Sequence, residues 1–133
     1  MRIQYPSISL LKYLVDILRK LYPSDYIKTY RPEALEMILE NMKWAGEEYR
    51  RKPNIVAAKA VSLLYDIIML HPLTDGNKRL AVLATVVFLI KNGYYVPRTT
   101  MFRLALLIAR NKVDKGEAYK WLLKELRPLR LKR

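Results

Sequence analysis

A nine-residue stretch, residues 71–79, gathers most of the groups in this chain that could do chemistry together. It reads His-Pro-Leu-Thr-Asp-Gly-Asn-Lys-Arg and holds the only histidine among the 133 residues. A histidine imidazole changes its charge near neutral pH, so His71 can accept a proton from a hydroxyl group. The carboxylate of Asp75 offers the hard oxygen that Mg²⁺ prefers, usually beside substrate phosphates. His71 and Asp75 are therefore candidate catalytic residues and Asp75 is a candidate Mg²⁺ ligand, although taken singly a capping His and an ordinary Asp-Gly-Asn turn are the commoner case.

The second half of this stretch has the features of a phosphate-binding site. Gly76 leaves the backbone bare, so a ligand can approach it closely. The first N–H groups of a helix that starts near Asn77 have no internal acceptor and lie at the positive end of the helix dipole. Lys78 and Arg79 add two cations there, which are unfavourable for the helix unless an anion is bound. The residues predicted to bind phosphate are Gly76, Asn77, Lys78 and Arg79.

Two apolar segments flank the stretch and predict where it lies in the fold. Residues 55–70 carry only two charges, Lys59 and Asp66, and residues 80–90 are apolar apart from Thr85. A helix that is apolar on every side is a buried one. The polar loop is therefore expected to join the two buried central helices, where its charges need partners or a ligand.

Further helices are predicted around these two. Apolar stripes at helical spacing run over residues 11–22, 35–49, 101–108 and about 116–126. Pro32 suits the first turn of the second helix. Candidate cap residues for the other helices are Ser7 or Ser9, Asn54, Thr74 or Asp75, and Thr99 or Thr100. The predicted fold class is all-α, a single domain over residues 1–133 that forms a compact bundle of about six helices with little or no sheet, and the basic tail, residues 127–133, is expected to be frayed.

Composition excludes several kinds of site and places the protein in a compartment. Without cysteine and with one histidine, the chain can form no disulfide, no thiol nucleophile and no metal site built from Cys or clustered His. It shows no signal-peptide pattern, and its longest apolar run is far shorter than the roughly 20 residues that cross a bilayer. We therefore expect a cytoplasmic protein with no membrane partner. The net charge of +13 suits nucleic acid, an acidic protein or solubility alone.

The nine-residue stretch resembles the signature of the Fic/Doc family, His-x-Phe-x-(Asp/Glu)-Gly-Asn-(Gly/Lys)-Arg. Residues 59–95 also resemble the family's central helix, loop, helix and closing Asn-Gly turn, here Asn92-Gly93. Leu73 replaces the usual Phe, and Val82 stands where Fic adenylyltransferases carry a second Arg that contacts nucleotide phosphates. Lys78, in place of Gly, and the missing Arg favour the Doc (death-on-curing) branch over ordinary AMP transfer.

The resemblance implies an ATP-dependent protein kinase of the Doc type. Such a toxin would transfer the γ-phosphate of ATP, with Mg²⁺, to a Ser or Thr hydroxyl of a target protein. The favoured target class is a translation elongation factor, so that translation stops. The fragment of residues 29–34 does not match the family's inhibitory string (Ser/Thr)-x-x-x-Glu-(Gly/Asn), so inhibition is expected from a separate antitoxin protein.

A short alternating segment precedes the second predicted helix. In the family this place holds a flap that clamps a segment of the target protein by strand pairing. The flap residues predicted by this resemblance are Tyr26, Ile27, Lys28, Thr29 and Tyr30. An ordinary loop stays an equal alternative.

Two other functions stay open from the sequence. The first is a Fic-type nucleotidyl transferase that passes AMP or UMP to a protein hydroxyl through the same loop. The second is a non-catalytic basic module that binds RNA or the ribosome, which the charge of +13 favours. The intact set of His, Asp, Gly, Asn, Lys and Arg in one loop speaks against the second.

Overall fold

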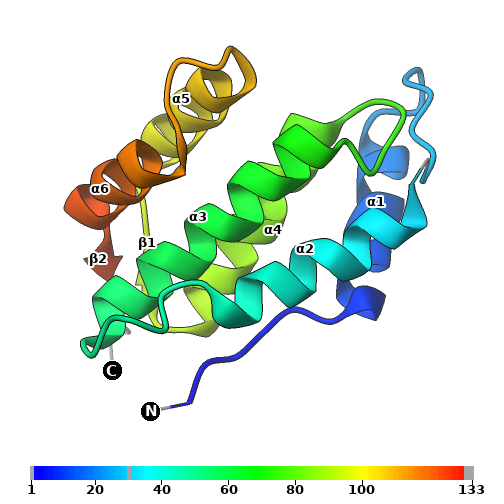
Figure 1. Ribbon diagram of the computed structural model, residues 1–133. Helices are drawn as coiled ribbons and strands as arrows, with labels where there is room; N and C mark the ends of the chain where they lie inside the picture. Colours follow the sequence, from blue (N-terminus) through cyan, green and yellow to red (C-terminus); the bar gives the residue numbers. More distant parts are fainter. Residues whose placement is uncertain (1, 30, 131–133) are drawn as a thin grey trace.

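The computed structural model describes residues 2–29 and 31–130, and these form an all-α bundle (Figure 1). The helices are α1 (Ile8–Leu21), α2 (Pro32–Trp44), α3 (Lys52–Leu70), α4 (Asn77–Lys91), α5 (Arg98–Ala109) and α6 (Lys115–Glu125). Two short strands, β1 (Tyr94–Tyr95) and β2 (Arg127–Pro128), pair antiparallel. The predicted bundle of about six helices with little sheet is therefore confirmed.

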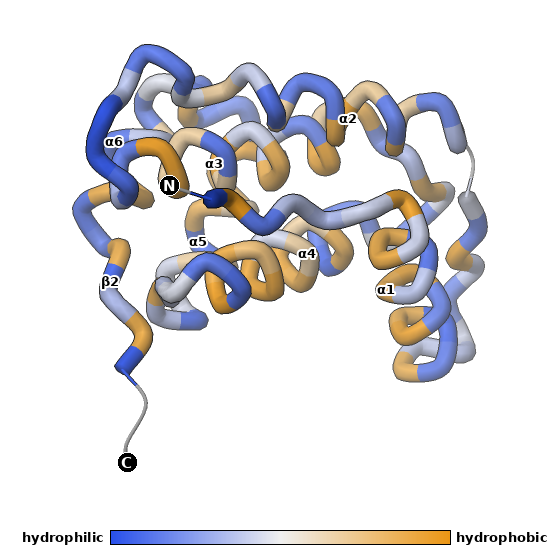
Figure 2. Tube along the Cα trace, turned by 90° about the horizontal axis from the view of Figure 1, so that it is seen from below, coloured by the Kyte–Doolittle hydropathy of each residue, from blue (hydrophilic) through white to orange (hydrophobic). Residues whose placement is uncertain are grey.

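The two helices that flank the motif loop form the centre of the molecule. α3 and α4 lie side by side, with α1 and α2 packed against one side of the pair and α5 and α6 against the other (Figure 1). Leu63, Leu80 and Phe88 are almost completely buried between these layers. Figure 2 shows that α4 is hydrophobic over most of its length. Within the described residues, α3 is the one helix long and apolar enough to cross a membrane, and its central, mostly buried position accounts for that composition.

The two charges expected in α3 are both paired. Lys59 is only 1% exposed, and its Nζ donates to the Met42 and Lys43 carbonyls at 3.2 and 2.8 Å. These carbonyls belong to the last turn of α2, where a cation is favourable. Asp66 is also buried and pairs with Lys115 at 2.9 Å. The charges therefore tie α3 to α2 and to α6.

The predicted caps are confirmed at one helix only. The Ser7 Oγ accepts the Leu10 N–H at 3.0 Å at the start of α1. The caps expected at Asn54 and at Thr99 or Thr100 are wrong, since α3 and α5 begin before them, with no side-chain cap. A proline in the first turn of α3 and another directly before α5 fix the backbone there instead. α6 has a capping box between Asp114 and Glu117, which was not among the predicted caps although Asp114-x-x-Glu117 has its sequence signature.

Segments near both ends of the described residues are fastened near the end of α4. The buried Asn92 side chain accepts the Gln4 N–H at 2.8 Å and donates to the Gln4 carbonyl at 3.0 Å. The Leu129 N–H donates to the Gly93 carbonyl at 2.8 Å, next to the β1–β2 pair. Residues 127–129 of the tail that was expected to be frayed thus have backbone partners in Gly93 and β1. Residues 131–133 lie outside the described part of the chain.

Candidate active site

The motif loop turns between α3 and α4 through two residues with left-handed backbone. His71 ends α3 with φ 49°, and Gly76 precedes α4 with φ 82°. Gly76 meets a backbone requirement here rather than a lack of space, because a Cβ at this position would lie 3.5 Å from Ile27, an ordinary contact. Histidine is among the few other residue types enriched in this conformation. The loop thus turns back sharply and leaves the start of α4 open.

Asn77 holds this loop from within. Its Oδ1 accepts the Leu73 N–H at 3.0 Å, and its Nδ2 donates to the Leu73 carbonyl at 3.0 Å. These two bonds fix the orientation of the amide, so the Nδ2 lying 3.1 Å from His71 Nδ1 is the donor in that contact. Leu73 itself is 2% exposed. It therefore anchors the loop in the core.

The contact with Asn77 determines which ring nitrogen of a neutral His71 carries the hydrogen. Because Nδ1 accepts, the hydrogen of the neutral His71 ring lies on Nε2. A group that gives a proton to Nδ1 must displace the Asn77 amide. A group that gives it to Nε2 needs the other tautomer, which also ends this hydrogen bond. His71 can therefore accept a further proton only when its contact with Asn77 breaks.

A cavity of about 540 Å³ brings the predicted site residues together. His71 is exposed at this cavity rather than sealed in the core. All six predicted catalytic and phosphate-binding residues line the cavity, together with Ile68, Met69, Thr74, Ala109 and Asn111. The cavity therefore has one polar end at the motif loop and apolar side chains from the end of α3 nearby.

The start of α4 is open to a ligand. The N-cap residue is Gly76, and no side chain caps the helix, so the N–H groups of Asn77, Lys78 and Arg79 have no acceptor among the described residues. Lys78 is exposed and forms no ion pair with the described residues. Amide donors, the helix dipole and a lysine ammonium thus converge where a phosphate group can bind.

Asp75 does not cap α4 as expected, and neither does Thr74. The Asp75 Oδ1 accepts the N–H of the next residue, Gly76, at 2.8 Å, and its other oxygen has no hydrogen bond to the described residues. No group of three or more His, Asp or Glu side chains lies together in that part of the chain. One exposed carboxylate suits a Mg²⁺ ion that arrives with nucleotide phosphates, since Mg²⁺ is usually bound in this way.

Arg79 is engaged by residues that the sequence pattern had not connected with it. Its Nη1 donates to Asp25 Oδ2, and the guanidinium carbon lies 3.8 Å from the ring centre of Tyr22. The hydrogen bond to Asp25 raises the pKa of Arg79 above its ordinary value, against the opposing effect of desolvation. The two cations of the motif thus differ in their surroundings: Lys78 is exposed, whereas Arg79 is bound by Asp25 and Tyr22.

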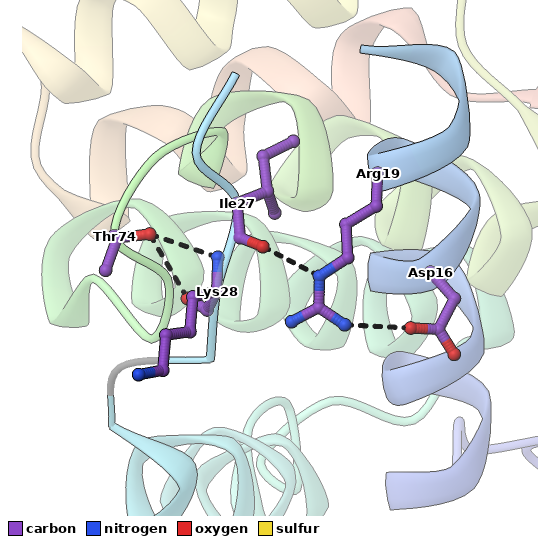
Figure 3. Close-up of polar contacts among 5 residues, drawn as sticks. All are labelled: Asp16, Arg19, Ile27, Lys28 and Thr74. Atoms are coloured by element: carbon purple, nitrogen blue, oxygen red, sulfur yellow. Dashed lines mark hydrogen bonds and ion pairs between the residues drawn. The ribbon is translucent and has the colours of Figure 1, made fainter. Parts of the chain in front are cut away.

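The predicted flap lies directly beside the motif loop (Figure 3). The Thr74 hydroxyl accepts the Lys28 N–H at 3.0 Å and donates to the Tyr26 carbonyl at 2.7 Å. Thr29 forms a single antiparallel bridge with Leu73, so the extended piece is one bridge long in the described residues. Tyr30, the last predicted flap residue, lies outside them.

The outer side of the flap is held from α1. The Arg19 Nε donates to the Ile27 carbonyl at 2.7 Å, and its guanidinium also pairs with Asp16 at 3.0 Å (Figure 3). After the flap, the Arg31 N–H donates to the Pro72 carbonyl at 3.0 Å. The segment is thus positioned by α1 on one side and by the motif loop on the other.

A second cavity of similar volume, about 570 Å³, lies between α2, α3 and α6. Its charged lining residues are Glu48 and Lys115, of which Lys115 is paired with Asp66, and no motif residue lines it. It has no open helix N-terminus with clustered cations. The cavity at the motif loop is therefore the candidate active site.

Sequence reasoning missed the far wall of that cavity. Ala109 and Asn111 come from the end of α5, and Asn111 has a left-handed backbone with φ 56°. An Asn after a helical stripe signals the end of a helix, which is all that its local pattern indicates. Its place in the cavity lining follows from the packing of α5 against α3 and α4.

Comparison with known protein families identifies the class of this protein. Residues 7–89 match the model described as Fic/DOC family. The match covers more than half of the chain and includes α1 to α4 with the motif loop, so the protein belongs to the Fic/DOC family. No match was found among curated proteins or among solved structures. Members of this family are generally transferases that modify proteins and typically use ATP as substrate.

Proposed function

We propose that this protein is a Doc-type kinase that transfers the γ-phosphate of ATP to a Ser or Thr hydroxyl of another protein. The observation that carries the proposal is the open first turn of α4, where Lys78 and Arg79 lie beside His71 in one cavity. Val82 supports phosphate rather than AMP transfer. It is 6% exposed, so the next turn of α4 presents an aliphatic side chain where nucleotidyl transferases of the family carry a phosphate-binding arginine.

In this proposal each polar group of the loop has one task. The amides of the first turn and Lys78 bind the terminal phosphates, and Arg79 balances the charge that develops on them. Mg²⁺, held by Asp75 and the nucleotide, would neutralise part of the phosphate charge. His71 takes the proton of the attacking hydroxyl while the oxygen of that hydroxyl bonds to the γ-phosphorus. The bond from that phosphorus to the bridging oxygen breaks, and ADP leaves with the electron pair.

The flap is proposed to hold the target protein. Thr29 lies opposite Leu73, next to the hydrogen bond from the Thr74 N–H to the Lys28 carbonyl. In an antiparallel pair with this register, the N–H and carbonyl of Thr29 face away from the motif loop. They can therefore pair with an extended segment of a target, whose hydroxyl side chain would reach His71.

The cellular role proposed is that of a cytoplasmic toxin neutralised by a separate antitoxin protein, with a translation elongation factor as the favoured target class. The basic surface of the chain, with a net charge of +13, supports an acidic antitoxin as partner. Induced expression of the single chain should stop protein synthesis in a bacterial host. Unimpaired growth at confirmed expression would contradict this role while leaving the chemistry open.

Isotope labelling tests the chemistry. The protein is incubated with Mg²⁺, a bacterial extract and ATP labelled at either the α or the γ position, and proteins are separated by electrophoresis. The proposal expects labelled protein from γ-labelled ATP only. Label from the α position would instead show nucleotidyl transfer. No label from either position, together with salt-dependent nucleic-acid binding, would favour the non-catalytic module.

A further inference from the structure

We propose that Asp25 and Tyr22 are positioning residues that fix the Arg79 guanidinium at the wall of the active-site cavity. The inference deepens the proposed function and rests on it, because it takes Arg79 to act on the phosphate groups of ATP. Neither residue belongs to the motif, and both precede the flap. They therefore connect the phosphate end of the site to the segment proposed to bind the target.

The first step is the way in which the guanidinium is held. Asp25 accepts a hydrogen bond from one N–H of Nη1. The Tyr22 ring covers one face of the guanidinium, whose central carbon lies 3.8 Å from the ring centre. The side chains of Arg79 and Asp25 are 40% and 30% exposed, so the pair lies at the cavity rim rather than in the core. A carboxylate at one corner and an aromatic ring on one face leave the planar group little freedom to rotate.

The second step is what remains for a ligand. A guanidinium carries five N–H donors, and the described part of the chain accepts only the one directed at Asp25. Arg79 also lines the cavity next to Lys78 and the open amides of α4. Donors on Nε and Nη2 are thus available to phosphate oxygens in the forked geometry that suits them.

The third step is how the two positioning residues are themselves placed. Tyr22 is the C-cap residue of α1, and its N–H donates to the Leu18 carbonyl at 2.9 Å. The Asp25 N–H donates to the Tyr22 carbonyl at 3.1 Å, and the Asp25 carbonyl accepts the Ile27 N–H at 3.1 Å. One hydrogen-bonded turn at the end of α1 therefore sets the ring, the carboxylate and the start of the flap together.

The opposite interpretation is that Asp25 is a latch that withholds Arg79 from ATP. The two interpretations predict opposite signs. Removing the Asp25 charge lowers transfer if Asp25 orients the arginine, and raises ATP affinity or transfer if it competes with phosphate. Positioning is favoured because Asp25 engages a single N–H and leaves the rest of the guanidinium available.

The experiment measures kcat and the KM for ATP in γ-label transfer for Asp25→Asn, Asp25→Glu, Tyr22→Phe and Tyr22→Leu. Glu36→Gln, on the exposed face of α2, removes the same charge away from the site and serves as the matched control. We expect Asp25→Asn to lower kcat/KM for ATP about tenfold to 10²-fold, as for a small misplacement of a catalytic group. Asp25→Glu should recover part of the loss, and Tyr22→Phe should retain more activity than Tyr22→Leu.

A double-mutant comparison with Arg79→Lys makes the inference specific. If Asp25 acts through Arg79, Asp25→Asn should cause no further loss in the Arg79→Lys background. Losses that multiply, or an Asp25→Asn protein as active as the wild type or more active, would overturn the inference and leave the proposed function standing. A wild-type protein that transfers no label would overturn both. If Asp25→Asn fails to fold, as judged by thermal unfolding, the two Tyr22 variants decide: equal activity of Phe and Leu overturns the inference.

Discussion

At the scale of single residues, the most informative feature is the backbone of His71. This residue ends α3 in the left-handed region, with φ 49°, and its ring is exposed at the cavity. A β-carbon in that conformation costs roughly 1–2 kcal/mol, and Asn and His tolerate it better than most residues. The usual alanine substitution would therefore combine loss of the imidazole with a strained loop.

We accordingly predict that His71→Asn lowers the rate of γ-phosphate transfer by about 10²–10⁴-fold, the typical contribution of a general base. Because His71 is exposed and Asn suits a positive φ, the midpoint of thermal unfolding should stay close to that of the wild type. His71→Ala, measured alongside, should lose as much activity and also some stability. An active His71→Asn protein would remove His71 from the mechanism.

The residues of the site were predictable from the sequence where the chemistry is local. The motif places a base, a carboxylate and two cations within nine residues, and the cavity contains them all. The partners of Arg79 were not predictable, because Asp25 is 54 positions away and reaches it only through the packing of α1 against α4. Asn111 was missed for the same reason.

At the scale of elements, the Thr74 hydroxyl adds side-chain hydrogen bonds to the backbone contacts that join the flap to the motif loop. This group accepts from the Lys28 N–H and donates to the Tyr26 carbonyl. Both hydrogen bonds are exposed, so removing them should affect overall stability little, whereas the position of the flap depends on them directly. From the sequence, Thr74 was expected only as a helix cap.

We predict that Thr74→Val, which keeps the side-chain shape and removes the hydroxyl, raises the KM for the target protein several-fold. The KM for ATP should change much less, because the amides of α4 and Lys78 are untouched. Steady-state kinetics with each substrate varied in turn checks this, and Thr74→Ser should restore the wild-type values. An equal rise in both KM values would mean that Thr74 orders the whole loop rather than the flap.

Lys59 tests how much the buried hydrogen bonds between α3 and α2 contribute to the stability of the fold. Its buried ammonium holds the last turn of α2, and Lys59→Met keeps the length of the side chain but leaves two carbonyls without their donor. We expect the free energy of unfolding to fall by about 1–3 kcal/mol. Urea unfolding followed by circular dichroism measures this, with Lys43→Met on the exposed face of α2 as a control expected within about 0.5 kcal/mol of the wild type. A stability equal to the control would show that the buried bonds contribute little.

Helices were predicted well from apolar spacing, but the starts of α3 and α5 were not. Spacing reports which face of a helix is buried, and α3 and α4 are buried as their composition requires. Starts depend on local backbone choices: Pro53 and Pro97 set the beginnings of α3 and α5 without side-chain caps, while Asp114 forms a capping box. The β1–β2 pair escaped prediction because two-residue strands have no periodic signal.

At the scale of the whole molecule, the cavity at the motif loop extends beyond the segment that matches the family, and much of the positive charge lies in the rest of the chain. The match ends at residue 89, yet the end of α5 completes the cavity wall. After residue 90 the chain holds twelve of its 25 Lys and Arg residues and three of its 12 acidic ones. The C-terminal third thus closes the site and carries a large share of the net positive charge.

This charge should cause non-specific binding to nucleic acid that is separate from catalysis. We predict that the affinity for a short duplex of arbitrary sequence, measured by fluorescence anisotropy, falls linearly with the logarithm of salt concentration. Reversing two exposed cations in the C-terminal third, as Arg103→Glu and Lys120→Glu, should reduce the salt slope by about one for each phosphate that the variant no longer neutralises. Transfer from γ-labelled ATP should persist in that double variant, and His71→Asn should bind the duplex like the wild type. If the double variant instead failed both to bind the duplex and to transfer label, the basic surface would belong to substrate binding, and the proposed separation of charge from chemistry would be wrong.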